Sequence, residues 1–283
     1  MEVSVITDEI DSDLERAVAV MSECGVRAAE LRQIWDKNIV DAPRDYWERA
    51  REILARQNIK VVGIASPFYK CDLPGVDGEP TGRMHNAEVR GMDEQAQVLD
   101  RAIEAAQFFD TNLVRVFTFW RRGKLTPDVE EAIVDAFRLP ASIASSAGIV
   151  LGIENEGACY IGTGEQLRNI VRRISADSVR GIWDPGNALL DGEEPFPRGY
   201  NAARDVIAHV HVKDYTMSTG SPRWAVVGEG DVDYRGQIDA LRKTGYDGYL
   251  SLETHYDGDG SKADASRLCL QRLIDMAGNR ELK

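Results

Sequence analysis

The sequence predicts an α/β fold: a closed (β/α)8 barrel that forms a single domain over residues 1–283. Short β-rich segments alternate with amphipathic helical segments, and no change in composition or Gly/Ser-rich linker divides the series. Several of the β-rich segments, such as residues 61–65 (VVGIA), are continuous apolar runs, which is typical of parallel strands buried on both faces. Parallel neighbours need helical crossovers, and eight such units in about 250 residues is the usual size of a closed barrel.

Eight segments carry the strand pattern. In chain order they are residues 3–6, 28–31, 60–65, 113–118, 149–154, 179–183, 206–212 and 248–253. An open, doubly wound sheet is the alternative for such a βα alternation. It is disfavoured because no Gly-x-Gly-x-x-Gly motif follows the first strand segment.

The segments between the strands have the period of helices. Residues 12–25 place Leu14, Val18 and Met21 on one face, and Gly25 is a typical helix stop. Thr163 is followed three residues later by Gln166, which predicts a capping box at the start of a helix over 163–174. The other predicted helices lie within residues 43–57, 87–109, 128–148, 233–248 and 263–278.

Two connections are unusually long: residues 66–85, after the third strand segment, and residues 214–233, after the seventh. Long loops in a compact domain are usually functional. In a barrel, the loops that follow the strands form the active-site face, so both connections are expected on that side.

The charge balance excludes several classes of partner. Lys and Arg number 34 against 47 Asp and Glu, a net charge of −13, which disfavours nucleic acid and anionic membranes. No apolar run approaches the roughly 20 residues of a membrane span, and the N-terminus lacks a cationic, apolar signal segment. The four cysteines form no Cys-x-x-Cys pair, so we expect reduced thiols and a cytoplasmic location. With neither a dinucleotide motif nor a P-loop, no nucleotide cofactor is expected.

Polar residues stand at the ends of the last four strand segments. They are Glu154, Asp184, His211 and Glu253, and each comes from a different βα unit. In a barrel all four would meet at one rim. Taken singly, each has an ordinary explanation: a strand-end carboxylate is often a helix cap or an ion pair, and an Asp before Pro-Gly is a common turn residue. Three carboxylates and one imidazole together would repel one another unless a cation balanced them. They therefore predict one divalent metal ion, with Mn, Co, Zn and Mg all compatible.

The segments IVLGIENEG, GIWDPGN, HVHVKD, VGEGDVDY and GYLSLETH resemble the xylose isomerase-like TIM-barrel superfamily, also called the sugar phosphate isomerase/epimerase family. Its members include D-tagatose 3-epimerase, hydroxypyruvate isomerase and inosose isomerase, and the resemblance covers essentially the whole chain. The resemblance implies that Glu154, Asp184, His211 and Glu253 are the ligands of one divalent metal ion. It also implies that Glu154 and Glu253 are catalytic and move protons on opposite faces of an α-hydroxy carbonyl substrate, through a metal-stabilised enediolate. Endonuclease IV relatives need more histidines than the four present here, so that branch is excluded.

One position departs from the family pattern. Epimerase relatives often carry His three residues after the sixth-strand Asp, where this chain has Asn187. An amide hydrogen-bonds a hydroxyl but transfers no proton at neutral pH. The expected function is isomerisation or epimerisation of a keto-sugar, inosose or related small polyol. The alternative is a lyase on the same site, either an inosose or dehydroshikimate-type dehydratase or a 3-keto-C-glycoside deglycosidase subunit. A barrel that binds a sugar without catalysis is a third hypothesis.

Other polar residues near the same strand ends are candidates for binding the substrate: Asn187, Lys213, Glu156, Arg115, Glu229 and His255. Arg115 lies inside a strand and therefore needs a partner such as Glu154. His209 shares a face with His211, and a hydrogen-bonded core position is the favoured interpretation for it. Trp183 is assigned to the core, whereas Trp120 and Trp224 could wall a sugar pocket. The expected partner is a small sugar or polyol, and the sequence leaves homo-oligomerisation open.

Overall fold

The computed structural model describes residues 1–76, 78–79, 90–217, 222–258 and 260–278. Parallel strands close into a barrel in the order β1-β12-β9-β8-β7-β6-β5-β2, which confirms the predicted single (β/α)8 fold. The strands are β1 (Glu2–Ile6), β2 (Ala28–Leu31), β5 (Lys60–Ala65), β6 (Leu113–Val116), β7 (Val150–Glu154), β8 (Val179–Trp183), β9 (Ile207–Val212) and β12 (Tyr249–Leu252).

The first and last strands pair with each other and close the barrel, with Val3 opposite Leu250 and Val5 opposite Leu252. The register of β2 against β5 shifts between Ala29 and Glu30. Such an irregularity re-aims a side chain. Here it accompanies a fully buried acidic residue, Glu30.

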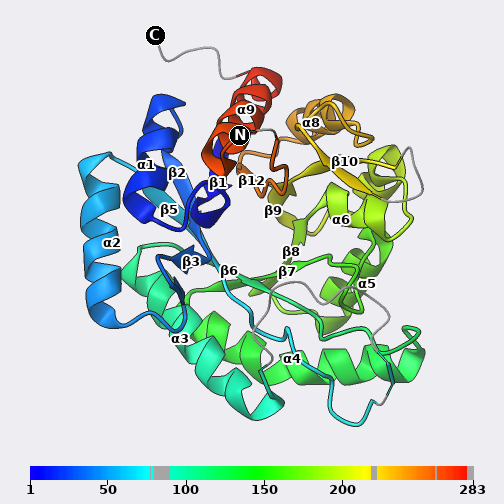
Figure 1. The fold of residues 1–283 in the computed structure, drawn as a ribbon. Coiled ribbons are helices and arrows are strands. Elements are labelled where there is room, and N and C mark those ends of the chain that lie inside the picture. Colours follow the sequence, from blue (N-terminus) through cyan, green and yellow to red (C-terminus); the bar gives the residue numbers. More distant parts are fainter. Residues whose placement is uncertain (77, 80–89, 218–221, 259, 279–283) are drawn as a thin grey trace.

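Helices surround the strands, as Figure 1 shows. The longer ones are α1 (Leu14–Glu23), α2 (Arg44–Arg56), α3 (Gln95–Phe108), α4 (Pro127–Ala147), α5 (Gly164–Ile174), α8 (Tyr234–Lys243) and α9 (Lys262–Ala277). The predicted capping box is present: Gln166 N–H donates to Thr163 Oγ1, and the Gln166 side chain accepts from Thr163 N–H. Helix α4 continues through Pro140 and ends at Gly148, whose φ of 70° is the left-handed conformation that glycine adopts readily.

The two long connections differ in how much of them is described. Residues 214–233 contain a hairpin of β10 (Asp214–Thr216) and β11 (Arg223–Ala225), although positions 218–221 lie outside the described residues. In the connection 66–85, residues 77 and 80–85 lie outside the described residues. Two short helices follow strands at the carboxyl end of the barrel: η1 (Thr7–Glu9) after β1 and α6 (Pro185–Leu190) after β8. Within the described part of the chain, none of the helices combines the length and apolarity that crossing a membrane requires.

Candidate functional site

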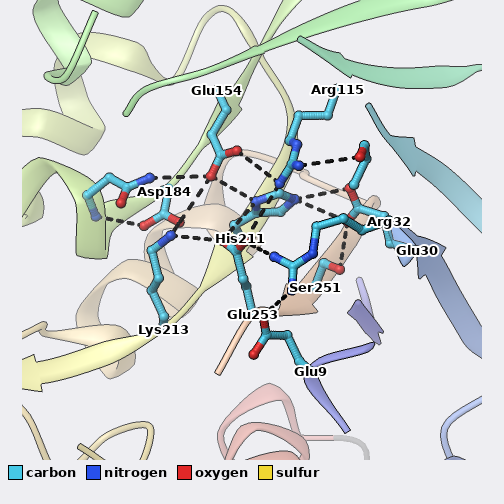
Figure 2. A network of polar contacts seen from close by, with 12 residues as sticks. Glu9, Glu30, Arg32, Arg115, Glu154, Asp184, His211, Lys213, Ser251 and Glu253 are labelled. Carbon is cyan, nitrogen blue, oxygen red and sulfur yellow. Dashed lines mark hydrogen bonds and ion pairs between the residues drawn. The ribbon is translucent and has the colours of Figure 1, made fainter. Parts of the chain in front are cut away.

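The four strand-end residues converge at the carboxyl rim of the barrel. Glu154 is the last residue of β7, His211 lies in β9, and Asp184 and Glu253 directly follow β8 and β12. One ligand atom from each side chain lies within 4.8 Å of the others. All four are at most 4% exposed, and Figure 2 shows them pointing toward one another. The structure therefore brings together the four residues that the sequence selected.

The imidazole of His211 lies between two acidic groups. Its Nδ1 is 3.1 Å from Glu154 Oε1 and 3.7 Å from Glu253 Oε2, so this nitrogen faces the cluster. Its Nε2 is 3.1 Å from Glu30 Oε2 on the other side. Burial lowers the pKa of His211, but the carboxylates of Glu30 and Glu154 outweigh burial and hold the pKa well above its ordinary value. Glu30 thus fixes the ring orientation from behind, as carboxylates do behind metal-binding histidines.

Glu30 itself has three buried partners. Ser251 Oγ donates to its Oε2 at 2.9 Å, and His209 Nε2 lies 3.1 Å from the same oxygen. His209 is 2% exposed, which confirms its assignment to the core. Glu30 was not among the site residues predicted from the sequence. The available signal was a lone acidic residue inside the apolar strand segment Ala-Ala-Glu-Leu.

Lys213 lies inside the carboxylate cluster. Its Nζ is 2.8 Å from Glu253 Oε2, 2.9 Å from Asp184 Oδ2 and 4.0 Å from Glu154 Oε1. Burial lowers the pKa of Lys213, but these carboxylates outweigh burial and hold the pKa well above its ordinary value. The ammonium therefore stays charged and supplies part of the positive charge that the cluster needs.

The two carboxylate oxygens of Asp184 have different surroundings. Oδ1 accepts from Asn187 N–H at 2.8 Å and caps helix α6. Oδ2 is buried and has no hydrogen bond of acceptable geometry from any described residue, although Lys213 Nζ is close. Burial, reinforced by Glu154 and opposed by Lys213, raises the pKa of Asp184 to about 6. A buried carboxylate oxygen without a hydrogen bond is costly unless a cation lies against it, and in this structure Lys213 is that cation.

Two arginines hold the catalytic candidates Glu154 and Glu253. Arg115 Nη1 lies 3.3 Å from Glu154 Oε2 and 3.6 Å from Glu253 Oε1, so the partner predicted for this buried arginine is present. Arg32 Nη1 donates to Glu253 Oε1 at 2.9 Å, and the rest of its guanidinium binds Asp8 and Glu9. Burial raises the pKa of Glu253, but Lys213, His211 and Arg32 outweigh it and hold the pKa well below its ordinary value.

Asn187 has a structural partner on each side. Its Nδ2 donates to Glu154 Oε1 at 3.3 Å and to the carbonyl of Asn155 at 2.8 Å. The Asn155 side chain in turn accepts from Asp184 N–H at 2.8 Å and donates to the carbonyl of Asp184. These amides orient Glu154 and Asp184, and the sequence analysis did not select Asn155.

A cavity of about 840 Å³ reaches the cluster at Glu154 and Glu253, whereas Asp184 and His211 are not among its lining residues. The predicted residues that line it are Glu154, Glu253, Asn187, Lys213, Glu156, Arg115 and His255. Trp224 lines it as well, whereas Trp183 is fully buried, as predicted. Arg32 and Glu9 also line the cavity, and the sequence analysis selected neither.

Glu229 is not where it was expected. The described lining of the cavity does not include it, and its side chain is half-exposed and accepts from Arg272 on α9 at 2.9 Å. Asp214 organises this loop instead, because its carboxylate accepts from the N–H groups of Gly228 and Gly230. The expectation that Glu229 binds substrate is therefore corrected: the loop turns about Asp214, and Glu229 faces outward.

The residues present fit a divalent cation. Three carboxylates and one imidazole nitrogen are typical ligands for Zn, Mn, Co and related ions. Asp184 Oδ2, which lies 2.9 Å from Lys213 Nζ, and His211 Nδ1, which lies 3.1 Å from Glu154 Oε1, both face the cluster, where such an ion would take the place of these contacts. The group Glu154, Asp184, His211 and Glu253 is thus the candidate metal centre.

Comparison with known proteins gives one family match and several distant relatives. Residues 18–273 match the family described as xylose isomerase-like TIM barrel. An inosose dehydratase of Lacticaseibacillus casei is 26% identical over 139 residues, which are 42% of this chain and 46% of that protein. The match to that relative thus spans about half of its length.

Solved structures share the whole fold. The probable 3-DHS dehydratase AsbF of Bacillus anthracis has a TM-score of 0.73 at 16% identity, over 99% of this chain and 100% of that one. The IolI protein, solved with a bound zinc atom, has a TM-score of 0.74 at 15% identity, over 100% of both chains. Likenesses at such identities show the fold alone.

Proposed function

The chain belongs to the xylose isomerase-like TIM barrel family, and from that premise we propose that it is a divalent-metal-dependent isomerase or epimerase. Its substrate would be a keto-sugar, an inosose or a related small polyol. The observation that supports this proposal is the convergence of four buried ligand side chains from four strand ends, with one ligand atom from each within 4.8 Å of the others.

Glu154, Asp184, His211 and Glu253 would hold the ion, with His211 binding through Nδ1. A bound divalent ion would supply Lewis acidity that makes the hydrogen next to a substrate carbonyl more acidic. The zinc atom in the IolI structure is in keeping with such a site in this fold. Glu30 would keep the His211 ring in place from its Nε2 side.

Glu253 is the proposed base and Glu154 the proposed acid. The cations around Glu253 keep it ionised, so it can accept the proton next to the carbonyl. Arg115 Nη1 lies within 3.6 Å of both carboxylates. Arg115 and Lys213 therefore place positive charge where negative charge would develop on the substrate oxygens. A different proton, taken up from solvent by Glu154 and delivered to the opposite face of the same carbon, would complete an epimerisation, and the abstracted proton would leave Glu253 to solvent. Delivery of a proton to the neighbouring carbon, with one proton moved between the two substrate oxygens, would complete an isomerisation.

A dehydratase on the same site is the second candidate, and Asn187, where epimerase relatives often carry His, leaves it open. The Asn187 amide donates to Glu154 and to the Asn155 carbonyl, and an amide transfers no proton at neutral pH. The partial match to an inosose dehydratase supports the same alternative. Both candidates begin with the same proton abstraction and differ in whether a hydroxyl group then leaves.

One experiment separates the two candidates. The manganese-loaded protein is incubated in D₂O with an inosose and, separately, with D-fructose, and the products are followed by NMR and mass spectrometry. Deuterium incorporated into a sugar that has not lost a molecule of water would support an isomerase or epimerase. A loss of 18 mass units would support the dehydratase. If no hydrogen is exchanged with any hydroxylated ketone tested, with or without added metal, the proposed proton transfer is wrong.

A further inference from the structure

Glu9 is a buried acid on the cavity wall that the proposed proton transfer does not use. It ends the short helix η1 after β1 and is only 2% exposed, yet it lines the cavity beside Glu253 and His255. Its Oε1 accepts from Arg32, the same guanidinium that binds Glu253 Oε1. Figure 2 shows Glu9 at the edge of the polar network, next to Arg32 and Glu253.

The second oxygen of Glu9 is not satisfied by the described residues. Glu9 Oε2 is buried and accepts no hydrogen bond from them. Lys262 Nζ lies 3.7 Å and His255 Nδ1 3.9 Å from this oxygen, both beyond hydrogen-bond distance. A buried carboxylate oxygen without a donor destabilises the folded protein, so a donor from a bound molecule would be favourable there.

The surroundings of Glu9 suit a hydroxylated carbon skeleton. Trp224 lines the same cavity, and its ring packs 4.5 Å from the His255 ring and edge-on to Tyr215 at 5.5 Å. A fixed aromatic ring provides an apolar surface for the C–H face of a ring-shaped polyol. The cavity thus offers a hydrogen-bond acceptor at Glu9 and an apolar ring at Trp224, each close to the His255 ring, and such a molecule can use both.

We propose that Glu9 Oε2, in the cavity that Trp224 also lines, binds a substrate hydroxyl group remote from the reacting carbons. The substrate is then a polyhydroxylated compound that reaches from the metal centre to Glu9, rather than a short hydroxy ketone. This inference rests on the proposed function only in placing the reacting end at Glu253. It also makes Glu9 a residue that determines specificity rather than a catalytic one.

Binding of unreactive probes tests this subsite without turnover. Calorimetry on the manganese-loaded protein compares myo-inositol, which has six hydroxyl groups, with cis-1,2-cyclohexanediol, whose two hydroxyl groups suffice only for the metal centre. We expect myo-inositol to bind roughly ten to a hundredfold more tightly than the diol, because one hydrogen bond to a charged group contributes about that much to affinity. Glu9→Leu should abolish this preference and leave diol binding unchanged, whereas Glu9→Gln, which still accepts a hydrogen bond, should keep most of it.

A control variant and the metal content distinguish the alternatives. Glu229→Gln changes an acid outside the described cavity lining and should leave the preference intact. The proposal is overturned if Glu9→Leu keeps the full preference for myo-inositol, or if Glu229→Gln loses it equally. It is also overturned if the protein binds a second metal ion that Glu9→Leu removes, because Glu9, Glu253 and His255 would then be a cation site. Failure of the hydrogen exchange in D₂O, with this preference intact, would contradict the proposed reaction and leave the subsite standing.

Discussion

Replacement of Glu253 by Gln removes the proposed base while keeping its shape and its oxygen Oε1. Loss of a positioned general base typically lowers the rate by 10²- to 10⁴-fold, or about 3–5 kcal/mol in the barrier. Folding should be less affected, because the cations left behind keep other partners. Lys213 retains Asp184 at 2.9 Å, and Arg32 retains Asp8 at 2.7 Å. We therefore expect a loss of stability near or below about 3 kcal/mol, the lower end for breaking a buried ion pair.

Three measurements on Glu253→Gln separate these effects. Circular dichroism during thermal unfolding reports the stability, metal analysis reports whether the ion is retained, and NMR in D₂O reports hydrogen exchange into the substrate. Glu229→Gln is the matched control, because Glu229 pairs with Arg272 outside the described cavity lining. A folded, metal-loaded Glu253→Gln that exchanges hydrogen within tenfold of the wild-type rate would refute Glu253 as the base.

Three further predictions concern the metal centre. Glu30→Gln should weaken manganese affinity about 10–100-fold, because the acceptor behind His211 Nε2 loses its charge, and calorimetric titration with unchanged affinity would contradict this. In the metal-free protein the pKa of Asp184 is about 6. Below pH 6 a metal ion must displace this proton, so the slope of log metal affinity against pH should steepen by about one in that range. A slope that stays constant from pH 5 to 7.5 would contradict this coupling to Asp184. Lys213→Met removes a positive charge 2.9 Å from Asp184, so the variant should bind manganese more tightly and turn over more slowly. Weaker binding measured by calorimetry would show that Lys213 supports the ion rather than competing with it.

The barrel was predictable because its signals are local. Continuous apolar strand segments, a helix stop at Gly25 and the Thr163 capping box all act over a few residues and agree with one another. The position of the four candidate ligands then followed from topology, since the carboxyl ends of parallel barrel strands share one rim.

The contacts around those ligands were harder to predict. Glu30 comes from β2 and lies against His211 of β9, 181 positions away in the chain, and a register shift beside it helps to set its direction. Glu9 follows β1 and Arg32 follows β2, yet Arg32 binds both Glu9 and Glu253, which lies near the end of the chain. Glu229 was misplaced because the glycine-rich loop turns about Asp214, which lies 15 positions earlier, and no local pattern records which acid faces inward.

The most direct test of the metal centre is metal content per chain. The protein is stripped with a chelator, reloaded with Mn²⁺, freed of excess ion by gel filtration and analysed by mass spectrometry, beside His211→Ala. The account predicts close to one ion per chain in the wild type and loss of tight binding in the variant, because Nδ1 is the single nitrogen of the four-residue cluster. A wild-type protein that retains no ion, or a variant that retains as much as the wild type, would contradict it.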